Sequence, residues 1–600
     1  MQEPEKVYKE NIGRYKVASA NFQEKARQIS WLRLMVFLIS LVGIIYLLQQ
    51  GFLVIAIGVA LVAGTGFIIL VRSHQKIQYG KDFHDALSEI NHQEIARKSL
   101  DLDDFPNGVE FEDISHPYSV DLDLFGQHSL FQLLNRTTTK AGAMMLSQWM
   151  LEPPKRKVIL ERQEAVRELS VNLEWLQDFQ ARGLLYKQHP EAGGELLKWI
   201  HEPLSVQTKP IYGWLKYILP VVTSGLIILY FSAVISYYFP LGFLVINGYV
   251  LAKFQVLAKD TYEKTYRNIQ TLKAYQSMIS KIESSSFEAL RLKTLHTHFA
   301  QKSYLASKAI QELQDILSRI ETRQNAFYWI LNPIFLLDIF WLWQAETWRK
   351  TYKDQVETWF ETISEFEVLS SMAAWCHSQP KYSFPEIADQ PFQLQAKVMG
   401  HVLLPSEDRI CNDFTLEGKG SIVVLTGSNM SGKSTFLRTI GTNAVLALMG
   451  SPVCAQKLVI SPYQLFTSMR TTDSLEENTS SFYAELKRLK QLIQLVEQPQ
   501  PVLFLLDEVL KGTNSHDRHQ GAAALIKQLS QKNAAGLVST HDLALGKLSD
   551  QMSPVQNFSF NSRMDNGRLV FDYQLKEGLC QSFNASQLMI QMGIDLDDTT

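Results

Sequence analysis

Cysteine is scarce in this 600-residue chain, and its four cysteines lie far apart with no CxxC pair. That spacing argues against a disulfide framework and against a zinc site built on paired cysteines. The net charge of −3 gives no general basic excess, so any site for nucleic acid must be local. The first residues lack the short basic region and cleavage site of a signal peptide. No region is of low complexity, and the length allows about two to four domains.

Two apolar runs follow the polar N-terminal residues, at about 31–48 and 52–71, and a turn at 49–51 separates them. A helix needs about 20 apolar residues to cross a bilayer, and both runs come close. Basic residues flank the pair, whereas the turn carries no charge, which predicts a hairpin that enters from the cytoplasm and returns. A buried hairpin of a soluble domain is the alternative, and the near absence of polar residues argues against it.

A second pair of apolar runs lies at 217–236 and 238–251, and we expect its turn at Phe239-Pro240. Asn247 interrupts the second half, so the pair is either a membrane hairpin or a buried or re-entrant one. Interfacial aromatic residues at its ends favour the membrane hairpin.

A third run, 327–343, contains Asn332, Pro333 and Asp338. Because an aspartate in the middle of a bilayer is costly, we predict a buried helix here rather than a span.

Residues 253–325 contain no proline and no glycine, and their apolar spacing predicts long amphipathic helices that form extended arms. Within them, 253–310 holds ten Lys or Arg against four Asp or Glu. A helical arm of this charge could follow the phosphates of DNA. A solvated helix face explains the same charges equally well.

The pattern changes after about residue 390, where short β-rich runs alternate with helical stretches. Such alternation predicts an α/β domain with a largely parallel sheet. The expected fold is therefore a C-terminal α/β P-loop (ABC-type) ATPase domain, preceded by an all-α core and lever region and two transmembrane helical hairpins. The expected domains are an N-terminal membrane region at 1–120 with its hairpin at about 31–71, a first core segment at 121–210, a second membrane hairpin at 211–255, a lever and second core segment at 256–388, and the ATPase domain at 389–600.

A phosphate-binding loop is the strongest local signal in the chain. The sequence GSNMSGKS fits GxxxxGK[ST], and it follows a predicted buried strand and precedes a predicted helix. In that setting backbone N–H groups and the helix N-terminus cradle a phosphate. We expect Lys433 to contact the β- and γ-phosphates of ATP and the hydroxyl of Ser434 to bind Mg²⁺. The predicted ATP-binding residues are Gly427, Ser428, Asn429, Met430, Ser431, Gly432, Lys433, Ser434 and Thr435.

Two more predicted strands end in residues suited to ATP hydrolysis. The strand at 502–506 runs into Asp507 and Glu508. Asp507 is expected to hold Mg²⁺ together with Ser434, and Glu508 is expected to act as general base on the attacking water. The strand at 536–539 leads to His541, which can sense the γ-phosphate. An ordinary acidic strand end and a structural surface histidine are the alternatives.

Ser480 or Ser481 opens a predicted helix. Either serine could cap that helix, and an exposed helix N-terminus can also receive an anion. On the residues alone, the helix cap is favoured.

These motifs, in this order and spacing, resemble the MutS family of mismatch-repair and recombination ATPases. The similar segments are GSNMSGKSTFLR at 427–438, SSFYAEL at 480–486, DEVLKGTNS at 507–515 and STH at 539–541, with further likeness to the family's helical core at 129–142, 159–167 and 363–387. The resemblance covers about 120–200 and 255–590.

The resemblance implies an ATP hydrolase that forms a homodimer through its ATPase domains. It implies that Ser480 of one subunit reaches the γ-phosphate held by the other, which replaces the helix-cap interpretation, and that Glu508, His541 and Ser480 are catalytic. It also implies that double-stranded DNA, mismatched or branched, is the partner of a clamp that ATP switches. Membrane helices stand where the family has its mismatch-reading domain, and Asn478, Leu510 and Arg518 replace family glycines, so mismatch specificity does not follow.

Two other functions remain open. An ABC-type transporter or a membrane-remodelling ATPase without DNA binding fits the membrane helices, although the Leu-Ser-Gly-Gly-Gln signature is absent and the apolar helices carry few charges to line a pathway. The second open function is a scaffold that does not bind DNA and that dimerises when it binds ATP. In each case we expect a multi-pass protein of the cell membrane that contacts lipid through two hairpins, with its ATPase and helical domains in the cytoplasm.

Overall fold

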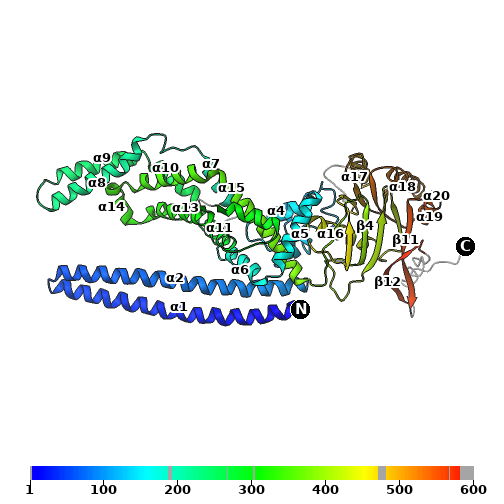
Figure 1. Ribbon diagram of the computed structural model, residues 1–600, viewed down its shortest axis with the longest axis horizontal. Helices are drawn as coiled ribbons and strands as arrows, with labels where there is room; N and C mark the ends of the chain where they lie inside the picture. Colours follow the sequence, from blue (N-terminus) through cyan, green and yellow to red (C-terminus); the bar gives the residue numbers. More distant parts are fainter. Residues whose placement is uncertain are drawn as a thin grey trace.

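The computed structural model describes residues 3–186, 192–266, 268–301, 304–470, 481–565 and 568–580. The molecule is elongated (Figure 1). The α/β domain lies at one end, a helical core lies beside it, and two helical arms run from the core toward the other end. Both arms therefore point away from this α/β domain, which is the predicted ATPase domain.

The first arm is an antiparallel pair of helices, α1 (Pro4–Gln49) and α2 (Leu53–Lys98). They reverse at Gln50-Gly51, where Gly51 takes a left-handed φ of 77° that glycine adopts without strain. The predicted helical hairpin at 31–71 is present, and its helices continue well beyond the apolar runs to the core. Both helices contain stretches long and apolar enough to cross a membrane.

The second arm carries α8 (Ile211–Phe231), α9 (Tyr238–Ala252) and α10 (Gln255–Thr265). Its turn lies at 232–237, so the prediction of a turn at Phe239-Pro240 is wrong. Pro240 instead sits in the first turn of α9, where a helix needs no N–H from it. By length and composition α8 could span a membrane, and α9 with α10 could form a further span bent by 53°.

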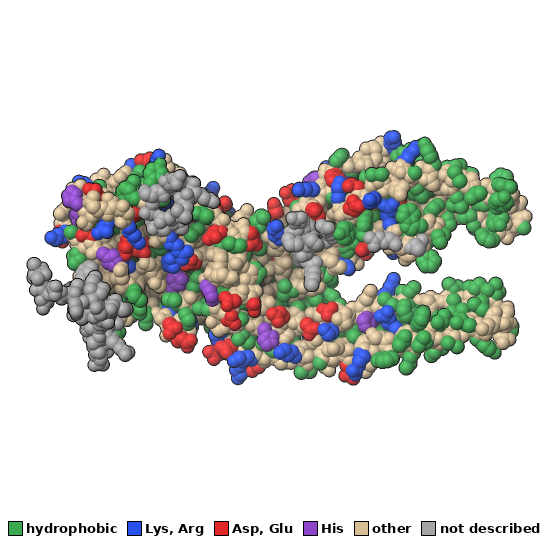
Figure 2. Space-filling view, turned by 180° about the vertical axis from the view of Figure 1, so that it is seen from behind, with side chains coloured by type: hydrophobic (Ala, Val, Ile, Leu, Met, Phe, Trp, Pro, Cys, Tyr) green, Lys and Arg blue, Asp and Glu red, His purple; other side chains and the backbone are tan. Residues whose placement is uncertain are grey.

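The third apolar run is two helices rather than one. Leu336, at φ 50°, separates α14 (Ala326–Phe335) from the long helix α15 (Leu337–Ser378). Asp338 is buried as predicted, but α14 turns a row of large apolar side chains outward. The prediction of a buried helix is therefore wrong for α14, because Asp338, on which it rested, lies in α15 and not in α14. Figure 2 shows hydrophobic side chains gathered at the far ends of both arms.

The core is helical and joins the arms to the ATPase domain. The helix α15 runs from the second arm to the ATPase domain and buries most of its residues from Val356 onward. The other core elements are η1 (Val109–Phe111), α3 (Leu130–Leu134), α4 (Lys140–Leu151), α5 (Arg156–Ser170), α6 (Leu173–Leu184), α7 (Ala192–His201), α11 (Asn268–Glu283), α12 (Leu290–Phe299), α13 (Ala306–Glu321) and η2 (Thr322–Gln324), with a small ribbon of β1 (Ala300–Gln301) and β2 (Tyr304–Leu305).

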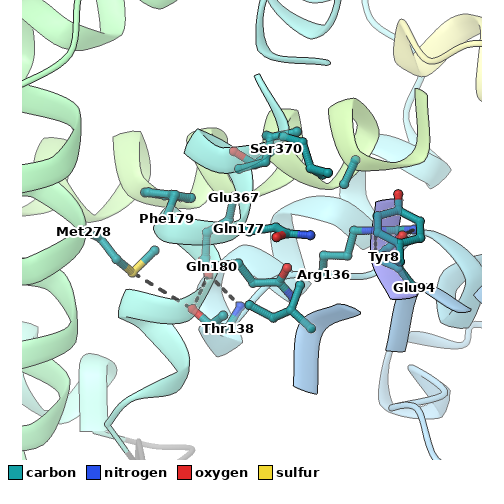
Figure 3. Close-up of a pocket in the computed structure, with 14 residues that line it drawn as sticks. Tyr8, Glu94, Arg136, Thr138, Gln177, Phe179, Gln180, Met278, Glu367 and Ser370 are labelled. Carbon is teal, nitrogen blue, oxygen red and sulfur yellow. Dashed lines mark hydrogen bonds and ion pairs between the residues drawn. The ribbon is translucent and has the colours of Figure 1, made fainter. Parts of the chain in front are cut away.

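Buried charges fix the base of the first arm to this core. Glu94 of α2 accepts two hydrogen bonds from the guanidinium of Arg136, at 2.8 and 2.9 Å, and both side chains are buried. Nearby, Glu367 of α15 accepts from the backbone N–H and hydroxyl of Thr138 at the start of α4. Figure 3 shows these residues around a small cavity, which Tyr8 of α1 also lines. The first arm is thus attached by packed and paired groups.

The ATPase domain is built on a six-stranded sheet of order β12-β11-β6-β10-β9-β8. Its five strands from β8 to β11 pair in parallel, and only β12 is antiparallel, which confirms the predicted largely parallel sheet. The strands are β6 (Ile422–Gly427), β8 (Gln464–Ser468), β9 (Val502–Asp507), β10 (Ala534–Thr540), β11 (Val555–Asp565) and β12 (Arg568–Glu577).

A second sheet and five helices complete the domain. The four-stranded sheet has the order β3-β7-β4-β5. Its strands are β3 (Glu386–Ile387), β4 (Gln393–Met399), β5 (Asn412–Glu417) and β7 (Lys457–Ile460), and the helices are α16 (Lys433–Met449), α17 (Ser481–Leu495), α18 (Ser515–Ser530), α19 (Leu543–Gly546) and α20 (Leu548–Gln551). One hydrophobic core runs without a break from the helical region into this domain.

Candidate nucleotide site

The predicted P-loop connects the end of β6 to the start of α16. It lies at the carboxyl edge of the parallel strands, where α/β sheets bind ligands. Gly427 is packed so closely that a Cβ there would lie 2.6 Å from Ser431 Oγ, and Gly432 takes a left-handed φ of 104°. Both positions therefore need glycine, and the loop backbone curls tightly ahead of α16.

Lys433 is a buried cation with no carboxylate within ion-pair distance among the described residues. Its Nζ donates to the carbonyl oxygens of Gly427 and Ser428, each at 3.0 Å, and burial lowers the pKa of the amine. Within the described chain the buried hydroxyls of Ser428 and Ser431 have no hydrogen-bond partner. A buried positive charge, two free hydroxyls and a helix N-terminus together suit a phosphate group.

The two predicted magnesium ligands lie in contact. Ser434 Oγ donates to Asp507 Oδ2 at 2.5 Å, and Ser539 Oγ donates to the other oxygen of the same carboxylate. No cluster of three or more His, Cys, Asp or Glu suited to a metal occurs in the described residues. Mg²⁺ is commonly held by one or two protein oxygens with water and phosphate completing its shell, so this pair fits that ion.

Glu508 adopts a backbone conformation that is unusual for a residue with a side chain, at φ 52°. Its Oε1 lies 2.6 Å from His541 Nε2, and its Oε2 lies 3.4 Å from Lys511 Nζ. The hydrogen bond to His541 is the main cause that lowers the pKa of Glu508 to about 2. The structure thus brings the predicted base and the predicted sensor together and holds the carboxylate ionised.

A cavity of about 500 Å³ opens beside these groups, within the size range of small-molecule sites. The P-loop from Asn429 to Phe436 and Glu508 line one side. The other side comes from the loop between β4 and β5, from the start of β5 and from β12, with His401, Asp408, Ile410, Asn412 and Tyr573. Sequence reasoning missed this second wall, because these residues form no motif and only the fold places them near the P-loop. Burial lowers the pKa of His401 to about 4, so this imidazole is neutral at physiological pH.

Ser480, the predicted residue acting across the dimer, lies outside the described residues, and α17 begins one residue later. The same helix contributes a residue that sequence reasoning did not single out for a role. Glu485 is buried and accepts a hydrogen bond from the backbone N–H of Leu510, just after Glu508. Leu510 takes a left-handed φ of 62°, which explains why the resembled family uses glycine there. The helix after Ser480 and the loop after Glu508 are therefore tied together.

The helical core contacts the ATPase domain beside the site. Asp121 accepts from Thr467 Oγ1 at 2.7 Å and from the backbone N–H of Arg470 at 3.0 Å. Asp123 pairs with Arg438 of α16 at 3.1 Å and with Arg470 at 2.7 Å. The core thus binds both the P-loop helix α16 and the segment that follows β8.

Half of the basic residues in the stretch 253–310 form ion pairs. Two of its ten basic residues, Arg267 and Lys302, lie outside the described residues. Five of the other eight form ion pairs, namely Lys259 with Glu263, Lys264 with Glu202, Lys281 with Asp178, Arg291 with Glu365 and Lys293 with Glu288. A continuous positive face for DNA phosphates is therefore reduced in this conformation.

Comparisons with known proteins agree with this architecture. The MutS domain V family matches residues 423–589, and the MutS domain III family matches 96–188. The DNA mismatch repair protein MutS of Geobacillus sp. (strain WCH70) is 30% identical over 234 residues, which is 38% of this chain and 27% of that protein. Those of Listeria monocytogenes serovar 1/2a (strain ATCC BAA-679 / EGD-e) and Thermosipho melanesiensis (strain DSM 12029 / CIP 104789 / BI429) are 26% and 23% identical, each over 75% of this chain. These longer matches span 56% and 58% of the relatives' own length.

Proposed function

This chain is a member of the MutS family, and from that premise we propose that it is a membrane-tethered ATPase that binds DNA and uses ATP hydrolysis to switch a dimeric clamp. The nucleotide site carries the ATPase part of the proposal. Lys433 is buried and lines a cavity, and no carboxylate of the described residues lies within ion-pair distance of it; Ser434, which is bonded to Asp507, lines the same cavity.

Each group of residues in the site has its own role in the proposed hydrolysis of ATP. Lys433 and the loop from Gly427 to Thr435 hold the phosphates of ATP, while Ser434 and Asp507 hold Mg²⁺. The ion supplies charge neutralisation on the phosphates when it is bound. Glu508 orients the attacking water and accepts its proton.

A carboxylate with a pKa of about 2 is a weak base, because a proton acceptor works best when its pKa lies near the operating pH. The hydrogen bond from His541 therefore restrains Glu508 in this conformation. Loosening of that bond when nucleotide binds would make Glu508 more basic, so His541 can couple the γ-phosphate to the chemical step.

The partners follow from the family and from the arms. We propose a homodimer through the ATPase domains, in which Ser480 of each subunit completes the other subunit's site. The relatives are named DNA mismatch repair proteins, and double-stranded DNA is the partner we propose here. The domain boundaries given above, with 389–600 as the ATPase unit, are part of this proposal.

The membrane tether is supported by the helices of both arms. Three helices, or four with the bent pair, are long and apolar enough to span, and their apolar tips lie at the same end of the molecule (Figures 1 and 2). We place the protein in the cell membrane, with the ATPase domain and the helical core in the cytoplasm.

Binding of DNA by the full chain in lipid nanodiscs tests the proposal. We expect binding to homoduplex, mismatched or branched DNA to weaken with salt on a linear log–log plot, and to change when ATP is added. Absence of binding at low salt, alongside normal ATP hydrolysis, would reject the DNA clamp.

The paired charges in 253–310 and the apolar tips of both arms favour a second candidate, a membrane-remodelling ATPase that does not bind DNA. In that case ATP would change the distance between the two arms within the bilayer. Spin labels on the tips of α2 and α9 would report such a change in the same nanodiscs.

A further inference from the structure

Helix α14 presents an apolar face that no described residue covers. Phe327 is 72% exposed, Ile330 is 64% exposed, and Trp329, Leu331 and Phe335 are also exposed. The helix has only ten residues, about 15 Å, which is half of a bilayer's hydrocarbon core. It is therefore too short to be counted as a span, and its exposed face is unexplained by the site described above.

The end of α14 is bonded to the apolar helices of the second arm. Asn247 of α9 donates to the carbonyl oxygen of Pro333 at 2.8 Å and to Thr223 Oγ1 of α8 at 2.9 Å. Thr223 follows Lys216 by seven residues, about 10 Å along α8. The end of α14 therefore lies well past the basic residue that marks the start of the apolar stretch.

Aromatic rings and Lys216 lie together where the apolar stretch of α8 begins. Lys216 Nζ lies 4.6 Å from the ring centre of Trp343 in α15 and 4.9 Å from that of Tyr217. Tryptophan, tyrosine and lysine gather at membrane–water interfaces. The chain turns at Leu336 between α14 and α15, and α15 then passes this belt at Trp343.

The polar groups of the reversal are satisfied inside the protein. Asp338 accepts from the hydroxyl of Tyr328 at 2.7 Å and from Asn332 Nδ2 at 3.0 Å, and it pairs with Arg323 at 3.1 Å. The backbone N–H of Leu336 donates to the carbonyl oxygen of Asn332 at 2.7 Å. A helix that turns back within a bilayer is tolerated where its polar groups are satisfied in this way.

We propose that α14 and the first turns of α15 form a re-entrant membrane hairpin whose apolar face contacts lipid acyl chains just below the headgroups. This inference rests on the proposed membrane tether and adds a third membrane element to it. Lipid is the occupant because the exposed face of α14 continues the exposed apolar surface of α8 and α9 and lies on the membrane side of the Lys216 belt.

Depth-dependent quenching of a fluorescent label tests this placement in the full chain. The two partly exposed cysteines are first replaced (Cys376→Ser, Cys411→Ser), and one environment-sensitive label is then attached at Ile330→Cys. Ile228→Cys on α8 is the matched site for the proposed span, since Ile228 is also 64% exposed. Ile114→Cys, beside the ATPase domain, is the aqueous reference. The ATPase rate of each labelled protein in liposomes verifies that it is folded.

We expect lipids with a nitroxide near the headgroup to quench the label at Ile330→Cys several-fold more than lipids with a nitroxide near the chain end. The label at Ile228→Cys should be quenched by either lipid, and the label at Ile114→Cys by neither. Quenching at Ile228→Cys without quenching at Ile330→Cys overturns the re-entrant hairpin and leaves the tether intact. Quenching at neither site overturns the tether and the hairpin together. A blue-shifted but unquenched label at Ile330→Cys means that protein covers this face, which also rejects the proposal.

Discussion

Two buried cations, Lys433 in the ATPase domain and Arg136 in the helical core, have different surroundings. Lys433 in the ATPase domain donates to carbonyl oxygens of its own loop, and no described carboxylate pairs with it. Arg136 at the base of the first arm is equally buried, but its guanidinium meets the carboxylate of Glu94 in two hydrogen bonds. A buried charge without a counter-charge is costly. The unpaired Lys433 therefore marks a place for a ligand, whereas the paired Arg136 belongs to a structural joint between the first arm and the core.

Removing the unpaired cation should have the largest effect on activity. Lys433→Ala should lower kcat/KM for ATP by about 10³-fold, since a charge aimed at the phosphates is lost. Binding of a fluorescent ATP analogue should weaken as well. Lys419→Ala removes an exposed lysine of the same domain and should change neither quantity. Normal ATP binding by Lys433→Ala would show that the buried cation has no ligand to meet.

Replacing the proposed base beside this cation should slow ATP hydrolysis and leave ATP binding intact. Glu508→Gln should lower kcat by about 10²-fold to 10³-fold while the affinity for ATP stays close to that of the parent, because only proton transfer is impaired. Phosphate release and nucleotide binding, measured on the same preparation, separate the two effects. Glu497→Gln, an exposed position in the same domain, is the control. Hydrolysis at the parent rate would remove Glu508 from the role of base.

At the structural joint, breaking a pair should lower stability and leave the chemistry intact. Glu94→Gln leaves Arg136 buried without a counter-charge, which should lower the free energy of local unfolding by about 3 kcal/mol. Amide hydrogen exchange along the last turns of α2 measures that loss. Glu89→Gln, on the exposed side of the same helix, should leave exchange unchanged. If Glu94→Gln instead lowered ATP affinity as strongly as Lys433→Ala, the two buried cations would not serve different purposes.

The nucleotide site was accessible from sequence because its parts are local. A buried strand, a glycine-rich loop and a helix follow one another from Ile422 to Met449, and the structure has them at β6 and α16. The contact between Glu508 and His541 was not predicted, because it depends on β9 and β10 being neighbours in the sheet. The second wall of the cavity around His401 was missed for the same reason.

At the ends of the two arms, local sequence patterns predicted the structure less well. Proline suggested a turn at Pro240, yet proline is also favoured in the first turn of a helix, and that is where it lies. Asn247 looked like an interruption, but its amide bonds Thr223 and the carbonyl oxygen of Pro333, which no local pattern reveals. Asp338 predicted a buried helix over 327–343, but it lies in α15, and the apolar face of α14 is exposed.

The link between Glu508 and His541 should appear in the dependence on pH. A hydrogen-bonded carboxylate with a pKa of about 2 stays ionised far into acid, so its contribution is present above its ordinary value of 4.5 and is lost as the pH falls toward 2. His541→Ala should raise the pKa of Glu508, and the acid limb of kcat should move to higher pH. His519→Ala breaks a 2.6 Å contact with Asp542 that does not involve Glu508, and it should leave that limb in place. An acid limb that does not move in His541→Ala would separate the two residues functionally.

The smallest expected effect comes from mixing subunits, and it extends the comparison to a second copy of the chain. Lys433→Ala removes the cation from its own subunit's site, whereas Ser480→Ala should remove a group from the partner's site. Each homodimer then has two damaged sites. In a heterodimer of the two variants both lesions fall at one composite site and the other site is intact. Random exchange of subunits makes half of the dimers mixed, so about a quarter of the parent activity should return in a symmetric dimer.

Two measurements make this result interpretable. Ser480→Ala alone should bind ATP like the parent, because the side chain does not belong to its own phosphate cradle. A mixture of Lys433→Ala with Glu508→Gln is the control, since both lesions damage the site of the subunit that carries them, and no activity should return. Normal hydrolysis by Ser480→Ala homodimers would make Ser480 a helix cap. Lack of recovery in the mixture, with subunit exchange verified, would mean that turnover needs both sites or that the ATPase domains do not meet in this way.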